Sequence, residues 1–292
     1  MRDENVISIR SLRKSYGGNE VLHGIDLQIV RGEIFALLGP NGAGKTTTVE
    51  ILEGYRDRDG GEVLVLGEDP SSAGASWRDR IGIVLQDSAD FPDLTVREAI
   101  SHFRHYYSRS RETEHLIEAV GLGEKSDEKI RSLSGGQRRR LDVALGIIGS
   151  PELLFLDEPT TGFDPKARRA FWELIKRLRD DGTTILLTTH YLDEAEALAD
   201  RVGVISGGEI LEIATPATLG GREKALATVS WRDQNGTLHK VETENPSELL
   251  RELIVEFPGE IPSLSVKRPS LEEIYLQMIG EELSDQESAQ LR

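Results

Sequence analysis

The sequence lacks cysteine entirely, which excludes disulfide bonds, thiol catalysis and zinc–thiolate sites. It also lacks any apolar run near the ~20 residues that a membrane-spanning helix needs. The opening stretch, MRDENVISIR, contains no apolar segment of signal-peptide length. We therefore expect any role at a membrane to come through another chain.

Acidic residues outnumber basic ones. The sequence has 51 aspartates and glutamates but only 35 lysines and arginines, so its net charge is −16. Such an acidic chain argues against binding to DNA or to an anionic membrane surface through a basic face, so we expect no nucleic-acid partner. A protein partner remains open. The 292 residues, 38% of them hydrophobic, suit one large globular domain, alone or with a smaller one.

Strand-like and helix-like patterns alternate along most of the chain. Two alternating runs open it, VISIRSL and VLHGIDLQIV, and continuous apolar runs follow in EIFALLG, LLFLD and TTILLTTH. Helical periodicity dominates from about residue 90 to 149, where Thr95 and Glu98 predict a capping box and Thr113 a helix cap. Strands separated by helices predict an α/β fold, with a mostly parallel sheet, an N-terminal antiparallel β subdomain and a helical insert.

The pattern changes after Ala214. An Asn235-Gly236 pair predicts a hairpin, and an amphipathic helix, a short strand and a second helix beginning PSLEE follow it. We expect a small α+β domain here, ahead of a polar tail of the kind that is usually disordered. The expected divisions are a domain at 1–218 with its helical insert at about 88–150, a domain at 219–280, and a disordered tail at 281–292.

The stretch GPNGAGKT, residues 39–46, matches G-x-x-x-x-G-K-[ST] at every fixed position and lies between a buried strand and a helix. Glycines let successive backbone N–H groups face one anion, Lys45 supplies charge for the β- and γ-phosphates, and the Thr46 hydroxyl is a Mg²⁺ ligand. A tight turn that happens to contain these residue types is the alternative, and it does not account for pattern and context together. The predicted nucleotide contacts are Gly39, Asn41, Gly42, Ala43, Gly44, Lys45, Thr46 and Thr47.

Two acidic residues end the apolar run in LLFLDEP. Asp157 and Glu158 lie at the carboxyl end of a strand, where ligands bind in open α/β sheets. We expect Asp157 to hold Mg²⁺, directly or through water, and Glu158 to act as general base toward an attacking water. A solvated turn is the usual alternative for adjacent acids at a strand end, but the phosphate loop upstream favours the site.

A second glycine loop, RSLSGGQRRRLDVAL at residues 131–145, opens another predicted helix. Such an opening binds anions through free N–H groups and the helix dipole; the alternative is an ordinary helix capped by Ser134. In order, GPNGAGKTT, VLQD, LSGGQ, LLFLDEPTTGFD and TTH resemble the ATP-binding cassette of ABC transporters, over roughly residues 6–215. The resemblance implies that two cassettes face each other, the partner being a second copy or a sister subunit. Each chain would then contact the ATP bound to its partner through Ser134, Gly135, Gly136 and Gln137.

The resemblance extends to four further positions. It implies that Tyr16 stacks on adenine, that Gln86 reaches the metal and the water, that His190 contacts the γ-phosphate and orients the water, and that Asp164 belongs to a loop that communicates across the dimer. Plainer alternatives are a sheet-edge tyrosine for Tyr16 and a polar strand end for Gln86. The chain carries Phe163 where leucine is usual in the family, a departure that we expect to change packing rather than chemistry.

Two groups of side chains have more general interpretations. The run Arg138-Arg139-Arg140 predicts a solvated or dimer-facing helix turn rather than a nucleic-acid patch. Aromatic residues of the helical insert predict either its core or the wall of a groove for a permease helix, and these are Phe91, Phe103, Tyr106 and Tyr107, with Phe91 the best groove candidate.

Two late stretches, LDEAEALADRVGVI and PSLEEIYLQMIG, look like the bacterial multidrug and antibiotic exporters of the daunorubicin-resistance type. That resemblance implies a Mg²⁺-dependent ATPase, without a covalent cofactor, that powers a separate permease from the cytoplasmic face of the membrane. Its cargo would be a drug, an antibiotic or a lipid-like compound. One rival is a soluble ABC ATPase acting on ribosomes or DNA, which the single uninterrupted cassette disfavours. The other is a phosphate-loop kinase or GTPase, in which LSGGQ would have no role.

Overall fold

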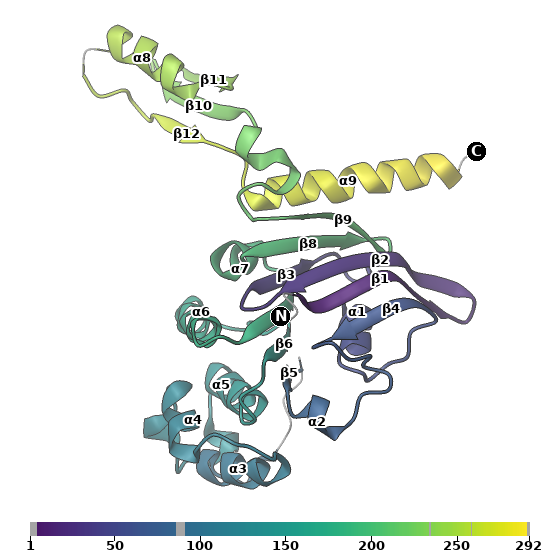
Figure 1. Ribbon diagram of the computed structural model, residues 1–292. Coiled ribbons are helices and arrows are strands. Elements are labelled where there is room, and N and C mark those ends of the chain that lie inside the picture. Colours follow the sequence, from purple (N-terminus) through teal and green to yellow (C-terminus); the bar gives the residue numbers. More distant parts are fainter. Residues whose placement is uncertain (1–4, 86–90, 234, 258, 291–292) are drawn as a thin grey trace. The chain divides into compact units, whose positions relative to one another are not determined.

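The computed structural model describes residues 5–85, 91–233, 235–257 and 259–290, and Figure 1 labels its elements along the chain. The chain divides into two compact units, Met1–Ile213 and Ala214–Arg292. This division falls close to residue 218, where the sequence predicts the end of the first domain. Within the described ranges, no helix combines the length and the apolar character needed to cross a membrane.

Six strands form the central sheet of the first unit, in the order β5-β6-β7-β3-β8-β9. Neighbouring strands from β5 to β8 run parallel. Every residue of β3 and β7 is buried, as expected for strands covered on both faces. The predicted mostly parallel sheet is confirmed, with strands β3 (Ile34–Leu38), β5 (Ile81–Val84), β6 (Leu153–Asp157), β7 (Thr184–Thr189), β8 (Arg201–Ser206) and β9 (Glu209–Ala214).

An antiparallel sheet, ordered β2-β1-β4, confirms the predicted N-terminal subdomain, with strands β1 (Asn5–Tyr16), β2 (Asn19–Val30) and β4 (Gly60–Val65). One buried cluster joins it to the central sheet, because Ile9 of β1, Leu52 of helix α1 (Lys45–Leu52) and Phe155 of β6 all belong to that cluster. Trp77 of α2 (Ala75–Arg78) completes it, and its Nε1 donates a hydrogen bond of 2.9 Å to a backbone carbonyl of β4. Helix α1 therefore begins on a core that both sheets share.

Helices and 3₁₀ turns fill the segment between β5 and β6, as the sequence predicts. They are α3 (Val96–Phe103), η1 (Arg104–Tyr106), α4 (Thr113–Ala119), η2 (Gly123–Lys125), η3 (Ile130–Ser132) and α5 (Gly135–Gly146). The capping box of Thr95 and Glu98 is confirmed. The cap predicted at Thr113 is wrong, because Glu112 precedes α4 and the buried Thr113 hydroxyl accepts a hydrogen bond of 3.2 Å from Arg104.

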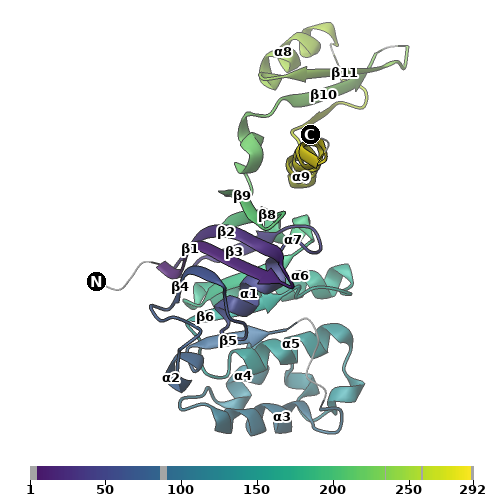
Figure 2. The ribbon, with the colours of Figure 1, turned by 90° about the vertical axis from the view of Figure 1, so that its right-hand side faces the viewer.

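Two further helices follow β6 and β7 in the chain, α6 (Pro165–Asp180) and α7 (Leu192–Leu198). Helix α6 buries one stripe of side chains, at helical spacing, formed by Phe171, Leu174, Ile175 and Leu178. Helix α7 contacts both β3 and β7. Figures 1 and 2 show α6 and α7 lying beside the central sheet, close to the strands that carry the site described below.

The second unit contains an antiparallel sheet ordered β11-β10-β12. The hairpin predicted at Asn235-Gly236 is confirmed, with Gly236 at a φ of 82° and Asp233 Oδ1 accepting the N–H groups of Asn235 and Thr237. The helix α9 continues through Gln290, whereas the sequence predicts disorder from residue 281; Glu, Leu, Gln and Ala in this segment favour helix. The elements are η4 (Leu219–Lys224), β10 (Ala227–Arg232), β11 (Leu238–Thr243), α8 (Pro246–Glu256), β12 (Ser265–Lys267) and α9 (Leu271–Gln290).

Candidate active site

The phosphate loop joins the end of β3 to the start of α1. At Gly39 a Cβ atom would lie 2.3 Å from the carbonyl oxygen of Ile205, and at Gly44, where φ is 104°, it would lie 2.5 Å from Leu22 Cδ2. Neither position admits a side chain without displacing its neighbour. Packing against β8 and β2 thus requires the two glycines that the motif specifies.

Lys45 is the first residue of α1 and is only 7% exposed. Its Nζ donates hydrogen bonds to the carbonyl oxygens of Gly39, at 2.7 Å, and Pro40, at 3.1 Å. Burial lowers the pKa of this ammonium group, while the charges of Glu158 and Asp157 act in the opposite direction. The lysine is therefore electrostatically coupled to the two carboxylates that the sequence places at the end of β6.

An open cavity of about 570 Å³ lies at this loop, within the size range of small-molecule sites. Eight predicted residues line it together with Val21, namely Tyr16, Asn41, Gly42, Gly44, Lys45, Thr46, Thr47 and Glu158. Gly39 and the buried Ala43 belong to the same loop. The second glycine loop and Asp164 do not line this cavity. A single chain therefore gathers the phosphate loop, Tyr16 and Glu158, but not the residues of the second loop.

Tyr16 ends β1 at the rim of this cavity and is 39% exposed. Lys14 Nζ lies 5.5 Å from the centre of its ring and Arg56 Cζ lies 5.2 Å from it, both within the range of cation–π attraction. The cavity thus has an aromatic wall with two cations beside it, which suits a ligand that carries both a flat ring and negative charge.

Thr188 of β7 sets the geometry of both carboxylates at the end of β6. Its hydroxyl donates to Asp157 Oδ1. Glu158 follows with a φ of 42°, a left-handed conformation that costs a non-glycine residue about 1–3 kcal/mol. The Thr188 carbonyl and hydroxyl oxygens accept the Glu158 N–H at 3.1 and 3.2 Å. The strained turn directs Glu158 into the cavity that the phosphate loop lines.

His190 follows β7 and lies beside Glu158, with 3.1 Å between its Nδ1 and Glu158 Oε1. The ring of Tyr191 packs against the histidine ring, with 4.1 Å between their centres. Thr161 Oγ1 donates to the other carboxylate oxygen of Glu158 at 3.4 Å. The two predicted catalytic side chains are therefore direct neighbours, held by contacts from both sides.

Glu194 of α7 is a buried acid that the sequence analysis missed. It has no exposed surface, and Trp172 Nε1 donates to its Oε1 at 3.4 Å. Burial raises the pKa of this carboxyl group, while the hydroxyls of Thr189 and Thr160 partly oppose that shift. Glu194 thus lies buried near the residue before His190 and near the loop that follows β6. An acid within the acidic stretch LDEAEA gives no sequence signal of such burial.

The second glycine loop begins α5 with a capping box. The Ser134 hydroxyl accepts the Gln137 N–H at 3.3 Å, and Gln137 Oε1 accepts the Ser134 N–H at 2.9 Å. Across the part of the chain that the structure describes, the N–H groups of Gly135 and Gly136 form no hydrogen bond. Ser134 is thus the helix cap that the sequence offered as an alternative, yet two donors remain for an anion.

The loop after Glu158 leads into α6 through Asp164, whose Oδ1 accepts the N–H groups of Lys166 and Ala167. The ring of Phe163 packs edge-on against the buried Phe171, with 5.7 Å between ring centres. The aromatic residue at the family's usual leucine position is thus a packing feature. Gln86, the remaining predicted site residue, lies outside the described residues.

Within the arginine run of α5, the predicted solvated or dimer-facing position is wrong for Arg139, whereas Arg138 and Arg140 are half-buried. Arg139 is 5% exposed, and its guanidinium donates to the carbonyl oxygens of Leu85, of Asp157 at 2.7 Å and of Pro159 at 3.1 Å. Asp142 lies 3.9 Å away, and burial lowers the pKa of the guanidinium, which nonetheless stays charged. One side chain thereby connects α5 with the ends of β5 and β6.

Replacing Arg139 with alanine should lower the free energy of unfolding by about 3–5 kcal/mol, because it leaves buried carbonyl oxygens without donors. Urea denaturation followed by circular dichroism measures the change. Arg140→Ala, at the half-buried neighbouring position, is the matched control and should cost less than about 1 kcal/mol. Equal losses in the two variants would contradict the role assigned to Arg139.

Fold and site together define a class of protein. A glycine-rich loop between a buried strand and a helix, with a lysine at its end, is a phosphate-binding device. Two carboxylates at the carboxyl end of β6 in the same sheet provide for a metal and for water activation. The chain is a phosphate-loop nucleoside triphosphatase by these features.

Comparison with known proteins identifies the family. Residues 22–161 match the family described as ABC transporter. The chain is 36% identical to the daunorubicin/doxorubicin resistance ATP-binding protein DrrA of Streptomyces peucetius, over 96% of this chain and 94% of that protein. It is 33% identical to the linearmycin resistance ATP-binding protein LnrL of Bacillus subtilis, over 96% of this chain and all (100%) of that one. The chain belongs to the ATP-binding subunits of ABC transporters, and its activity is ATP hydrolysis that drives transport.

Other comparisons agree. The Nod factor export ATP-binding protein I of Cupriavidus pinatubonensis is 38% identical over 96% of this chain and 92% of its own length. A solved ATP-binding subunit of an ABC transporter superposes with a TM-score of 0.66 at 24% identity, covering 73% of this chain and 91% of that structure. The ADP form of another ATP-binding cassette gives a TM-score of 0.65 at 23% identity, with 72% and 91% covered. The predicted cassette fold is confirmed.

Proposed function

We propose that this chain energises an exporter, pairing with a separate membrane permease that moves a drug, an antibiotic or a lipid-like compound out of the cell. One observation carries the proposal. The similarity to DrrA, LnrL and the Nod factor export protein spans 96% of this chain, and so includes the second unit as well as the cassette. Those relatives are named for resistance or export. ATP hydrolysis alone does not account for a match that extends over both units.

The proposed ATP site uses the residues that line the loop cavity. The backbone N–H groups of the loop surround the phosphates, and Lys45 adds its charge to the β- and γ-phosphates. Tyr16 offers its ring to the adenine, and such ring-on-base stacking is worth about 1–3 kcal/mol in nucleic-acid complexes. The neighbouring cations Lys14 and Arg56 increase the attraction for a charged nucleotide.

The residues at the site also fit Mg²⁺, with Thr46 and Asp157 as the proposed ligands and Gln86 as a third. Among the described residues no group of three or more acidic or histidine side chains is arranged to hold a metal. That agrees with Mg²⁺ in nucleotide sites, which takes few protein oxygens and completes its shell with phosphates and water. Thr188 donates to Asp157 Oδ1, and the carboxylate would still offer a charged oxygen to the ion. When bound, the ion neutralises charge on the β- and γ-phosphates.

In the proposed hydrolysis, Glu158 takes the proton of the water that attacks the γ-phosphate, and His190 holds that water and the phosphate in position. The contact of 3.1 Å between His190 Nδ1 and Glu158 Oε1 keeps the two side chains at one reacting centre. Asp164, Ser134, Gly135, Gly136 and Gln137 act on ATP bound to an opposing cassette, a second copy or a sister subunit. The free N–H groups at the start of α5 support this division of labour.

An apolar groove of about 350 Å³ lies between β5 and the helical insert, lined in part by Ile83, Leu85, Phe103 and Tyr107. Leu85 is 58% exposed and Ile83 is 38% exposed, an arrangement typical of a docking surface. We propose that the groove receives a permease helix, which would hold the chain at the cytoplasmic face of the membrane. Phe91 is not among its lining residues and packs edge-on against Phe103, with 5.1 Å between ring centres.

Glu53 also lines this groove. Burial raises the pKa of its carboxyl group to about 8, with further contributions from the negative charges of Asp157 and Glu50. Glu53 is therefore largely neutral at pH 7 and adds little charge to the groove. Arg78 and Asp142 also line the groove and carry opposite charges, and a mainly apolar groove with no excess of positive charge suits the apolar face of a helix better than it suits a nucleic acid.

Replacing Leu85 with aspartate should reduce co-purification with the permease by more than about 100-fold, because the complex would bury an unpaired carboxylate. The test purifies the tagged chain in detergent from membranes of the cells that produce it and measures the permease that co-purifies. ATP binding should be unchanged. Val255→Asp on α8, where the side chain is 84% exposed, is the matched control. A complex that survives Leu85→Asp argues against the groove, and capture of ribosomes in place of a permease argues for the soluble rival.

A further inference from the structure

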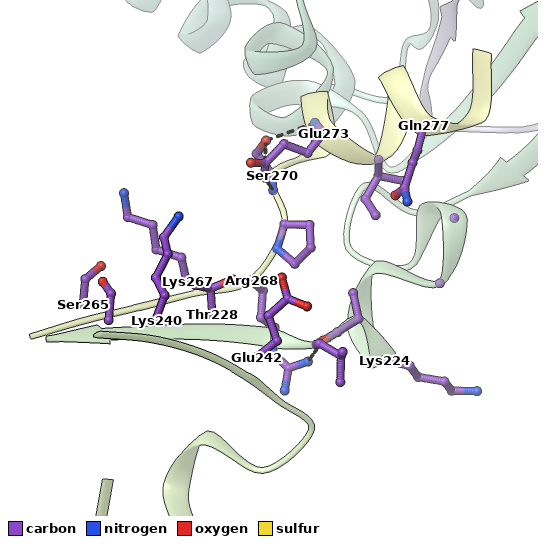
Figure 3. A pocket seen from close by; sticks show the side chains of 17 residues that line it. Lys224, Thr228, Lys240, Glu242, Ser265, Lys267, Arg268, Ser270, Glu273 and Gln277 are labelled. Carbon is purple, nitrogen blue, oxygen red and sulfur yellow. Dashed lines mark hydrogen bonds between the residues drawn. The ribbon is translucent and has the colours of Figure 1, made fainter. Parts of the chain in front are cut away.

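The second unit contains a hollow of about 1060 Å³ that the ATPase activity does not use. Its floor is one face of the β11-β10-β12 sheet, and its walls come from η4 and the start of α9 (Figure 3). The opposite face of the sheet carries Val229 and Trp231, which pack with residues of α8 and the segment after it. Because side chains alternate along a strand, Thr228 and Ser230 of the same strand face the hollow instead.

The charges around this hollow are distributed unevenly. The sequence from 214 to 292 has 14 acidic residues and eight lysines or arginines. Only two of those acids line the hollow, Glu242 and Glu273, whereas four of the cations do, Lys224, Lys240, Lys267 and Arg268. All three lysines of this unit are among them. A positive hollow in a strongly acidic chain attracts anions selectively.

The strand register places two of these lysines on either side of β10. Ser230 pairs with Lys240 of β11, and Thr228 pairs with Lys267 of β12. Both lysines therefore project from the face that carries Thr228 and Ser230, on the two strands that flank β10, and Figure 3 shows Lys224 extending in another direction. We call this pair, Lys240 and Lys267, the lysine pair.

Two of the other charged groups of the hollow have structural tasks, while Glu242, opposite Thr228 on β11, shares the floor with the lysine pair. Arg268 donates to the carbonyl oxygens of Glu223 and Ala225 at 3.0 and 2.8 Å. Glu273 Oε2 accepts the Ser270 N–H at 2.7 Å at the start of α9. Within the described ranges neither member of the lysine pair forms an ion pair with a carboxylate. The pair is thus available to a ligand, with the hydroxyls of Thr228, Ser230 and Ser265 on the same floor.

We propose that this hollow binds a phosphate group, carried either by a soluble phosphorylated compound or by the headgroup of an anionic lipid. The lysine ammonium group is a compact point charge that binds phosphate well, whereas the paired N–H groups of an arginine guanidinium match a planar carboxylate. In Arg268 these N–H groups already donate to backbone carbonyls. Two ammonium groups on one face of the sheet balance the double charge of a phosphate monoester and also attract the single charge of a lipid phosphodiester, and hydroxyl groups donate to phosphate oxygens. The volume admits a ligand larger than phosphate alone.

Lysine acetylation read by mass spectrometry tests this proposal residue by residue on the full chain. Pyrophosphate is the soluble probe, and vesicles of phosphatidylglycerol, compared with phosphatidylcholine, are the lipid probe. Saturating probe should slow acetylation of Lys240 and Lys267 by about tenfold or more, and leave the half-buried Lys176 of α6 unchanged. Because the readout is specific to each lysine, pyrophosphate at the phosphate loop does not interfere. Protection by pyrophosphate alone identifies a soluble ligand, and protection by phosphatidylglycerol alone identifies a lipid headgroup.

A double variant, Lys240→Gln with Lys267→Gln, supplies the second measurement. NMR titration of the second-unit resonances with pyrophosphate should give at least tenfold weaker affinity in this variant. Arg251→Gln, which removes a cation of the same unit outside the hollow, should bind as the native chain does. Circular dichroism checks the fold of both variants. Unprotected lysines under both probes, or equal affinity in the double variant and the native chain, would overturn the proposal.

Discussion

Replacing Glu158 with glutamine should slow ATP hydrolysis by about 10²–10⁴-fold while leaving ATP binding intact, because a general base is worth that factor. The change corresponds to about 3–5 kcal/mol of barrier. The amide has the shape of the carboxylate but cannot accept the proton, so the ATP-bound chain should accumulate as a dimer. Phosphate release measures the rate, a fluorescent ATP analogue measures binding, and size-exclusion chromatography in ATP reports the dimer.

The matched control for this change is Asp193→Asn. Asp193 is an exposed acid in the first turn of α7 that pairs with Arg168 at 3.0 Å, so the variant removes one negative charge close to His190 without touching the reacting centre. It should retain turnover within a few-fold of the native chain. Native turnover in Glu158→Gln would remove Glu158 from the role of base, whatever its distance to His190.

Replacing Ser134 with arginine should abolish hydrolysis while the same chain still binds ATP at its own phosphate loop. The substitution removes the cap of α5 and places a long cation where the N–H groups of Gly135 and Gly136 would meet the partner's nucleotide. We expect a loss of at least about 100-fold, the factor found when a preorganised donor is removed from a reacting centre. Phosphate release and nucleotide binding are measured on the same preparation.

Two companions separate the anion site from the helix cap in this test. Ser134→Thr keeps a capping hydroxyl and should keep most of the activity, and Ser134→Ala should cost stability of about 1 kcal/mol through the cap alone. A Ser134→Arg chain that hydrolyses ATP at the native rate would show that the second glycine loop only caps α5. Loss of ATP binding would show instead that the substitution damages the whole cassette.

The parts of the fold that the sequence predicts well are those governed by local rules. Continuous apolar runs become the buried strands β3, β6 and β7, because a strand covered on both faces has no polar side to show. The Asn235-Gly236 hairpin follows from backbone geometry that few residues tolerate. The phosphate loop is predictable for the same reason, since Gly39 and Gly44 have no room for a Cβ atom.

The parts that escape the sequence depend on contacts between distant segments. Arg139 lies in a run of three arginines that looks solvated, and only the tertiary fold shows its guanidinium among carbonyl oxygens from β5, β6 and the following loop. The burial of Glu194 is likewise not predictable, because the neighbouring acidic residues in the sequence suggest an exposed segment. Thr113 is a residue type that often caps helices, but it is the first residue of α4 and its hydroxyl accepts a hydrogen bond from Arg104 of η1. In each case a long-range partner overrides the local pattern.

The position of Arg139 has a consequence for cooperativity. Its helix, α5, begins with the residues proposed to serve the ATP of an opposing cassette, while its guanidinium holds the backbone next to the chain's own Asp157. In the proposed dimer, we expect a movement of α5 upon engaging one nucleotide to reach the machinery around the other. Such linkage acts equally in both directions at equilibrium. The two ATP molecules of a dimer should then bind cooperatively, with a Hill coefficient above 1. In Arg139→Lys, which loses the guanidinium, this coefficient should fall toward 1.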